Sequence, residues 1–369
     1  MTTVSAGYLS PLLEWPGAVV ASGLDAGTAL HYGDPLGEQR VIETAAGLLD
    51  RSHRGVLVVA GVERLEWLHS ICSQFVRDLA DGESTRALVL SPNGHIEQDW
   101  QMTELGGQVW LDVEPGQAEA ALAYLLKMRF MKRVEPADMS ADFAVLSVLG
   151  PRAADVLARA GEPVPSTAPF PADRPETARI IAGAPTAAGG RAPVTSASAR
   201  PGGGLVRSTH DGFDLVVPRE DVAAVAQSLR SAGAAAVGAW AASAIRVERR
   251  RPRLGLDTDH RTLPHEIGWI GVSVHLNKGC YRGQETVARV HNLGRPPRSL
   301  VLLHLSGERD ELPEPGSPVE LDGRTVGFVG TAVHHHELGP IALAVVKRSV
   351  AERAGSTLLV AGVTAAIDA

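Results

Sequence analysis

Short apolar runs and amphipathic stretches alternate along residues 50–130. The run GVLVVA at 55–60 predicts a buried strand, because it is short and apolar throughout. Apolar side chains recur at helical spacing over 62–72, which predicts a helix directly after this strand. The predicted elements, in order, are strand 55–60, helix 62–72, strands 86–90, 95–102 and 108–113, and helix 117–130.

A similar order recurs further along the chain. The predicted elements there are strand 143–149, helix 150–160, strands 178–182 and 213–217, and helix 219–232. The two stretches share no sequence identity, so the repeat is one of pattern, and it predicts two α/β units of β-α-β-β-α character. Between them, 185–204 contains one bulky apolar residue, Val194. Such a segment buries too little area to offset its ordering entropy, which predicts a mobile surface loop.

The last third of the chain changes in style after Pro296-Pro297. Short β runs at 299–305, 318–321, 325–333 and 341–346, separated by glycine-containing turns, predict an all-β C-terminal domain and a small barrel. Before it, 238–253 is a predicted helix that ends in a run of arginines. Those cations either complement the helix dipole or form a patch for phosphate or a polyglutamate tail.

Composition narrows the function classes. The chain has 369 residues, enough for two or three domains, and its 35 basic and 42 acidic residues give a net charge of -7. This balance argues against a general nucleic-acid or membrane-surface binder. No apolar run approaches a bilayer span and no signal-peptide pattern begins the sequence, so we expect a cytoplasmic protein.

The cysteines are two, Cys72 and Cys280. Two cysteines exclude a disulfide framework, a CxxC redox pair and a four-cysteine zinc site within one chain. They also exclude a conventionally caged iron-sulfur cluster, which takes about four protein ligands. A reducing compartment fits this cysteine usage.

Cys280 stands in the most unusual segment, NKGCYRGQETVAR at 277–289. Lys278 precedes it by two residues and Arg282 follows it by two, so either charge could lower the pKa of the thiol if the geometry allows. The two glycines, Gly279 and Gly283, permit close backbone approach to a ligand. The structural alternative is a turn followed by a helix, with an inert buried cysteine.

The octapeptide KGCYRGQE at 278–285 resembles the signature of the YgfZ family of folate-binding proteins. That family is related to the T-protein (aminomethyltransferase) of the glycine cleavage system. Three further segments resemble motifs of these families: DRSHRG at 50–55, AIRVE at 244–248 and PHEIG at 264–268. The resemblance covers roughly residues 30 to 350.

The resemblance implies an α+β fold, a three-domain GcvT-like ring with tetrahydrofolate in its central opening. Two ferredoxin-like α/β units, the first discontinuous, would be joined by a C-terminal β-barrel. The implied domains are 1–140 with 238–295 for folate binding, 141–237 with the insertion 185–204, and 296–369 for the barrel. Members of the YgfZ family support assembly or repair of iron-sulfur clusters in client enzymes.

The resemblance also assigns site residues. Arg246 matches a folate-contacting arginine of the T-protein. Gln98 and Asp99 match its catalytic aspartate pair, and His210 matches a pterin-binding glutamate. A carboxylate can manage a proton near the folate nitrogen, and Gln98 cannot, so these changes put aminomethyl transfer in doubt.

The signature segment completes the predicted site. Cys280 would act as a thiol near bound folate, with Lys278 tuning it. Tyr281, Gln284, Gly279 and Gly283 would shape the pocket and Trp269 would wall it.

No metal site is predicted. Adjacent strand residues point to opposite faces, so the histidines at 334–336 cannot all converge, and we expect a solvated turn there. Three hypotheses stay open: a tetrahydrofolate-binding helper of iron-sulfur enzymes, a folate-dependent one-carbon transferase or demethylase, and a non-catalytic scaffold.

Overall fold

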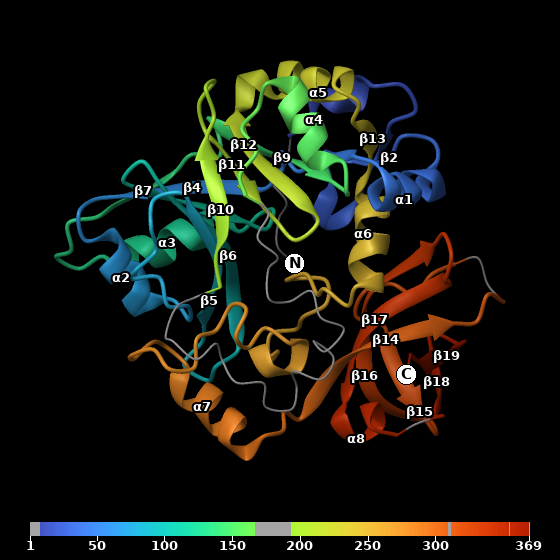
Figure 1. Ribbon diagram of the computed structural model, residues 1–369. Helices are drawn as coiled ribbons and strands as arrows, with labels where there is room; N and C mark the ends of the chain where they lie inside the picture. The colour runs from blue at the N-terminus through green and yellow to red at the C-terminus, as the bar shows by residue number, and fades with distance from the viewer. Residues whose placement is uncertain (1–7, 167–192, 309–310, 354, 369) are drawn as a thin grey trace.

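The computed structural model describes residues 8–166, 193–308, 311–353 and 355–368. Figure 1 shows a large sheet with helices on its outer sides and a barrel at lower right. Among the described residues the sheet has eleven strands in the order β13-β3-β9-β12-β11-β10-β5-β6-β7-β4-β8. No described helix is both long and apolar enough to cross a membrane.

One half of the sheet is covered on its outer face by α2 (Arg64–Ile71) and α3 (Ala118–Met128). Its strands are β4 (Gly55–Ala60), β5 (Glu83–Leu90), β6 (Ile96–Leu105), β7 (Gln108–Val113) and β8 (Glu135–Asp138). Alternate residues such as Trp100 and Met102 pack beneath the helices, and both are fully buried. The intervening residues of β6 therefore face the middle of the molecule.

The other half is covered by α4 (Ala153–Ala160) and α5 (Val222–Ser231) (Figure 1). Its strands are β3 (Gly47–Asp50), β9 (Phe143–Leu149), β11 (Leu205–Ser208), β12 (Gly212–Pro218) and β13 (Ala235–Val237). Phe213 and Leu146 pack against the helices in a separate apolar core. The uncovered faces of the two halves meet through a small cluster that includes Val56 and Val145.

Strand β10 (Thr195–Ala199) joins the two halves, and it corrects the prediction of a mobile loop over 185–204. Ala197 to Ala199 pair with β11, while Thr195 and Ser196 pair with β5. The small residues of this segment bury little area, but backbone hydrogen bonds to a strand on each side hold it. Residues 185–192 and the strand predicted at 178–182 lie outside the described residues.

Helices α1 (Pro35–Thr44) and α6 (Ala239–Glu248) form a further layer beside the N-terminal ribbon of β1 (Val19–Val20) and β2 (Ala29–His31). Asp34 caps α1 by accepting the N–H of Gly37 at 2.9 Å, and proline occupies the first helical position. The inner face of α6 packs on the barrel through Ala244 and Val247.

The barrel closes in the order β14-β17-β16-β15-β18-β19 in the part of the chain described. Its elements are β14 (Arg298–Leu305), β15 (Pro318–Leu321), β16 (Arg324–His335), β17 (Gly339–Lys347), α8 (Arg348–Ala351), β18 (Thr357–Val360) and β19 (Val363–Ile367). This arrangement follows the β runs predicted after Pro296-Pro297, with closure through the pairing of β14 and β19.

Helix α7 (Gln284–Leu293) begins within the signature octapeptide and packs on the β5–β6 turn, where a Cβ at Gly94 would lie 2.9 Å from Cβ of Thr286. Gly283 precedes it with φ +82°, and a Cβ at Gly283 would lie 2.5 Å from the carbonyl oxygen of Ser91 and 2.9 Å from Cα of Gly94. The signature glycine therefore serves close packing of backbone on backbone. Gly279 lacks this constraint, because a Cβ there meets nothing within 4 Å.

These two glycines give a matched test. Gly283→Ala is expected to lower the free energy of unfolding by about 1–3 kcal/mol, since it forces both a left-handed alanine and a steric overlap. Gly279→Ala should leave stability close to wild type. Chemical denaturation measures both variants, and equal stabilities for the two would contradict this assignment.

Candidate functional site

The inner face of the β5–β6–β7 region is polar, although it is buried. Arg86 on β5 lies opposite Gln101 on β6, which lies opposite Asp112 on β7. Asp99 projects from the same face, two residues before Gln101. Buried charged side chains on one face of a sheet are unusual unless they are paired or serve a site, so this face is the starting point of the candidate site.

Asp99 is paired with Arg86 in a two-pronged ion pair. Nε of Arg86 donates to Oδ1 of Asp99 and a terminal nitrogen donates to Oδ2, each at 2.6 Å. The guanidinium carbon lies 3.9 Å from the ring centroid of Trp269, which is 4% exposed. The three side chains form a stack of carboxylate, guanidinium and indole, so both oxygens of Asp99 are committed to a cation.

The charged face continues through a network of buried ion pairs. Asp112 binds Arg54 at 2.8 Å and Arg207 at 2.5 Å, and Arg207 binds Asp214 at 2.8 Å. Glu114 binds Arg54 at 2.7 Å and Arg253 at 2.7 Å. Because these residues come from the turn before β4, the C-terminal end of β7, strands β11 and β12, and the segment after α6, the network connects both halves of the sheet.

Glu114 gives this network a pH dependence. Burial alone would raise the pKa of its carboxyl, but Arg253 and Arg54 outweigh burial and lower it from 4.5 to about 2. A group with a lowered folded-state pKa stabilises the protein above its ordinary pKa and loses that contribution as pH falls. Between about pH 4.5 and 2, the free energy of unfolding of the wild type should therefore fall more steeply with decreasing pH than that of Glu114→Gln. The difference between the two slopes corresponds to uptake of up to one proton on unfolding. Denaturation curves across this range measure the slope, and identical slopes would contradict the assignment.

Arg51 is the inner arginine with the weakest pairing. Its closest acidic contact is Asp214 at 3.9 Å, and its side chain is 36% exposed. Its pKa is nevertheless lowered by burial, and the nearby Arg54 and Arg253 add to this effect. A cation that is surrounded by protein, solvent-accessible and without a close hydrogen-bonded carboxylate can accept an anionic group.

Lys278 of the signature is buried at the end of α2. Its ammonium donates to the carbonyl oxygens of His69, Cys72 and Gln74, the last two at 2.5 and 3.2 Å, and it lies 5.0 Å from the ring centroid of Tyr281. Burial lowers its pKa. The predicted role of Lys278 in tuning Cys280 receives no support from this geometry, because the ammonium caps α2 beside Cys72 instead.

Cys280 is exposed, whereas Cys72 is buried. Arg282, the other charge expected to act on the thiol, pairs with Glu97 at 2.7 Å. Gln284 supports the loop, since its Oε1 accepts the N–H of Tyr281 at 3.3 Å and its amide donates to the carbonyl of Lys278 at 3.4 Å. The loop thus exposes the thiol of Cys280, while hydrogen bonds and an ion pair hold the residues on either side of it.

Tyr281 is buried under this loop at 8% exposure, and its hydroxyl has no hydrogen-bond partner among the described residues. Burial raises its pKa. The ring packs with Trp269, Ile96 and Val345 in a cluster shared by the β5–β6 hairpin, the signature and the barrel. An unpartnered buried hydroxyl marks a place where a ligand could supply the missing hydrogen bond.

The structure does not bring Gln98 to this face. Gln98 lies on the same face of β6 as Trp100 and Met102, so it points toward α3, donates to the carbonyl of Ala120 at 3.2 Å and accepts the indole N–H of Trp100 at 2.8 Å. Asp99 alone of the predicted pair faces the middle. Adjacent residues of a strand point to opposite faces, so the ordinary pleat of β6 separates the two members of the predicted pair.

Arg246 and His210 are both engaged by other protein groups. Arg246 donates to Asp257 at 2.6 Å and to Thr331 of β16 at 2.6 Å, and so ties α6 to the barrel. His210, in the turn between β11 and β12, contacts Arg251 of the segment after α6. A folate contact by either residue would have to coexist with these contacts to the protein.

The arginine run directly follows the C-terminal end of α6, and its members are ion-paired within the protein. Each member has an acidic partner distant in sequence: Arg249 and Arg251 bind Asp211, Arg250 binds Asp368, and Arg253 binds Asp25 and Glu114. The run therefore joins the last turn of α6 to four other segments. The signal missed in the sequence is the pair of acids that ends the apolar strand β7, Asp112 and Glu114.

The histidines at 334–336 correct a second expectation. His335 is 3% exposed and not part of a solvated turn, because Gln39 of α1 bonds the backbone on both sides of it. Ligand atoms of Glu43, His335 and His336 lie within 4.8 Å of one another. Two neighbouring histidines converge because β16 ends at His335.

The hydrogen bonds of His335 argue against ligation of a metal by this group. Nδ1 of His335 accepts the backbone N–H groups of Glu337 and Leu338, each at 3.2 Å. Its neutral ring then carries the proton on Nε2, which leaves no lone pair there for a metal. His336 is held by Glu43 at 2.6 Å.

Comparison with solved structures defines the fold. The glycine cleavage system aminomethyltransferase T from Bartonella henselae superimposes with a TM-score of 0.76 at 22% identity, covering 97% of this chain and 95% of that one. The fold is thus the GcvT-like α+β fold with a closed C-terminal barrel, as predicted.

Comparison of sequences defines the family. Residues 32–184 match the model described as the GCVT N-terminal domain. An aminomethyltransferase of Geobacillus kaustophilus is 30% identical over 323 residues, 85% of this chain and 82% of that protein. One of Symbiobacterium thermophilum is 29% identical over 313 residues, 82% and 78% of the two chains. The chain belongs to the GCVT aminomethyltransferase family.

Proposed function

We propose that this protein is a tetrahydrofolate-binding member of the YgfZ branch of the family and that it supports assembly or repair of iron-sulfur clusters in client enzymes. The observation that carries the proposal is the signature loop, which presents the thiol of Cys280 at the surface while Lys278 and Gln284 anchor its backbone. An exposed thiol on a fixed loop can be reached by a partner protein.

The candidate acid–base groups support the same choice. Aminomethyl transfer needs a group that can take up or release a proton near the folate nitrogen. Gln98 has no such capacity and points away, and Asp99 is held by both oxygens on Arg86. The two substitutions and this pairing favour binding of the folate over its turnover.

The residues present fit the parts of tetrahydrofolate. Trp269 and Tyr281 offer apolar ring surface and an unpartnered hydroxyl to the pterin, and Arg51 offers a weakly paired cation to an anionic tail. When bound, tetrahydrofolate would supply a carrier for one-carbon units. The side chains of this protein would hold and orient it, and the Arg86–Asp99 pair would keep the inner face charged.

A transferase remains the second candidate, because the relatives in the comparisons are named aminomethyltransferases. The two proposals separate in one assay. Purified protein, tetrahydrofolate and an aminomethyl donor should give no methylene-tetrahydrofolate above background under our proposal. Catalytic turnover that disappears in Asp99→Asn would establish the transferase instead.

A further inference from the structure

The loop after α3 has a backbone conformation that its sequence does not favour. Helix α3 ends at Met128, and Phe130 then adopts φ +47°. Gly161 and Gly294 occupy the equivalent left-handed positions after α4 and α7, with φ of +76° and +74°. Glycine avoids the strain that a side chain suffers there, so a phenylalanine in this place needs a reason other than the fold.

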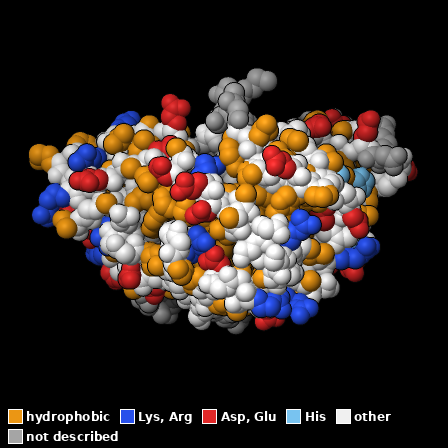
Figure 2. Space-filling view, turned by 90° about the horizontal axis from the view of Figure 1, so that it is seen from above, with side chains coloured by type: hydrophobic (Ala, Val, Ile, Leu, Met, Phe, Trp, Pro, Cys, Tyr) orange, Lys and Arg blue, Asp and Glu red, His pale blue; other side chains and the backbone are white. Residues whose placement is uncertain are grey.

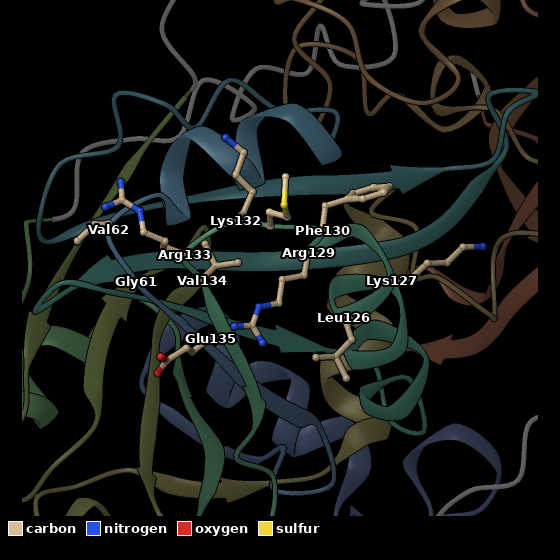
Figure 3. Close-up of a pocket in the computed structure, with 11 residues that line it drawn as sticks. Gly61, Val62, Leu126, Lys127, Arg129, Phe130, Lys132, Arg133, Val134 and Glu135 are labelled. Carbon is tan, nitrogen blue, oxygen red and sulfur yellow. The ribbon is translucent and has the colours of Figure 1, made fainter.

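The side chains of this loop make little contact with the rest of the protein. Phe130 is 85% exposed and Met131 is 98% exposed. Val62, in the turn after β4, is 75% exposed, and Leu126 on the last turns of α3 is 49% exposed. These four residues and the neighbouring cations, here called the α3-end patch, line a hollow of about 880 Å³ (Figure 3).

Cations outnumber acids in the lining of the hollow. Figure 3 shows Lys127 at the right, Lys132 above, Arg129 near the centre and Arg133 at the left beside Val62, with Glu135 as the one acidic residue of the lining. Lys132 and Arg133 share one acid, Glu63. Lys127 and Arg129 have no ion pair within the described residues. At the left-hand end of Figure 2, where Figure 1 draws this loop, hydrophobic and basic side chains lie side by side.

We infer that the α3-end patch is a docking site for an acidic protein segment that inserts apolar side chains into the hollow. The unpaired cations give charge complementarity to carboxylates, and Phe130 and Met131 give apolar area to bury. A flat bilayer would reach the protruding tip and leave the hollow empty. Nucleic acid would use the cations and leave exposed Met131 without a partner.

The test uses the full-length protein and two labelled peptides as probes. One is an amphipathic helix with leucines on one face and glutamates on the other, and the second carries lysines in place of the glutamates. Fluorescence anisotropy should show saturable binding of the acidic peptide alone, weakened by added salt. Arg129→Glu and Met131→Ser should each weaken it about tenfold or more.

Phe130→Gly separates docking from folding. It removes the left-handed strain, so its melting temperature should equal or exceed that of the wild type, while its affinity for the acidic peptide falls by about tenfold. Leu293→Ser is the matched control, because Leu293 is 74% exposed at the end of α7, outside the patch. It should bind the acidic peptide as tightly as the wild type.

Four results would overturn the inference. They are equal binding of the acidic and basic peptides, no saturable binding of the acidic peptide, sedimentation with phosphatidylglycerol vesicles in place of peptide binding, and self-association that Met131→Ser abolishes. None of these readouts involves folate or Cys280, so they are independent of the proposed function.

Discussion

Asp112→Ala is expected to lower the free energy of unfolding by about 3–5 kcal/mol, because it leaves two buried arginines without their shared carboxylate. Asp112 is 2% exposed and bridges Arg54 and Arg207 across the two halves of the sheet. Both guanidiniums would keep one acid each, Glu114 and Asp214, but the network would carry excess positive charge in a buried place. Chemical denaturation at neutral pH measures the loss.

Glu66→Ala provides the matched control. Glu66 also forms an ion pair with an arginine, Arg77, but the two side chains are 56% and 51% exposed. Water screens such a pair, so its loss should change stability by about 0–1 kcal/mol. Equal effects of the two substitutions would show that the inner network does not hold the sheet halves together.

Replacement of Cys280 should remove function and spare the fold. In a strain without the chromosomal gene, Cys280→Ser should leave iron-sulfur enzyme activity at the level of the empty vector, because a hydroxyl cannot replace a nucleophilic or ligating thiol. Cys72→Ala should restore activity, since Cys72 is buried and its thiol faces the carbonyl of Gln74. Enzyme assays in extracts, with immunoblots for protein level, measure both.

A thiol titration of purified protein checks the structural basis of this result. The wild type should show one fast-reacting thiol, from exposed Cys280, and a second only after unfolding. Cys280→Ser should show no fast thiol and unchanged circular dichroism. Full activity of a folded Cys280→Ser variant would remove the thiol from the proposed function.

The fold was predictable to a large extent because its elements have clear periodic patterns. The helix predicted at 117–130 is α3, shortened to Met128 where the backbone turns left-handed at Phe130. Strand β10 was missed because its alternating small and polar residues carry no apolar signal, and pairing with two neighbours decides its conformation. The domain division at 140, 237 and 295 stays a prediction.

The candidate site was less predictable, because side-chain pairing is not local in sequence. The sequence located the signature, but it could not show that the ammonium of Lys278 turns inward to α2 while Cys280 turns outward. Nor could it show that Arg86 neutralises Asp99, since Arg86 lies opposite Gln101 in the strand register and reaches Asp99 diagonally. The predicted roles of Tyr281, Gln284, Trp269, Arg246 and His210 in binding folate stay predictions.

Calorimetric titration with tetrahydrofolate tests the central claim most directly. The account predicts saturable binding of one equivalent by the wild type and weaker binding by Arg51→Met, which removes a cation that has no close partner of its own. Arg152→Met, on the exposed start of α4, serves as the control and should bind as the wild type does. Absence of any saturable heat for the folded wild-type protein would contradict the account.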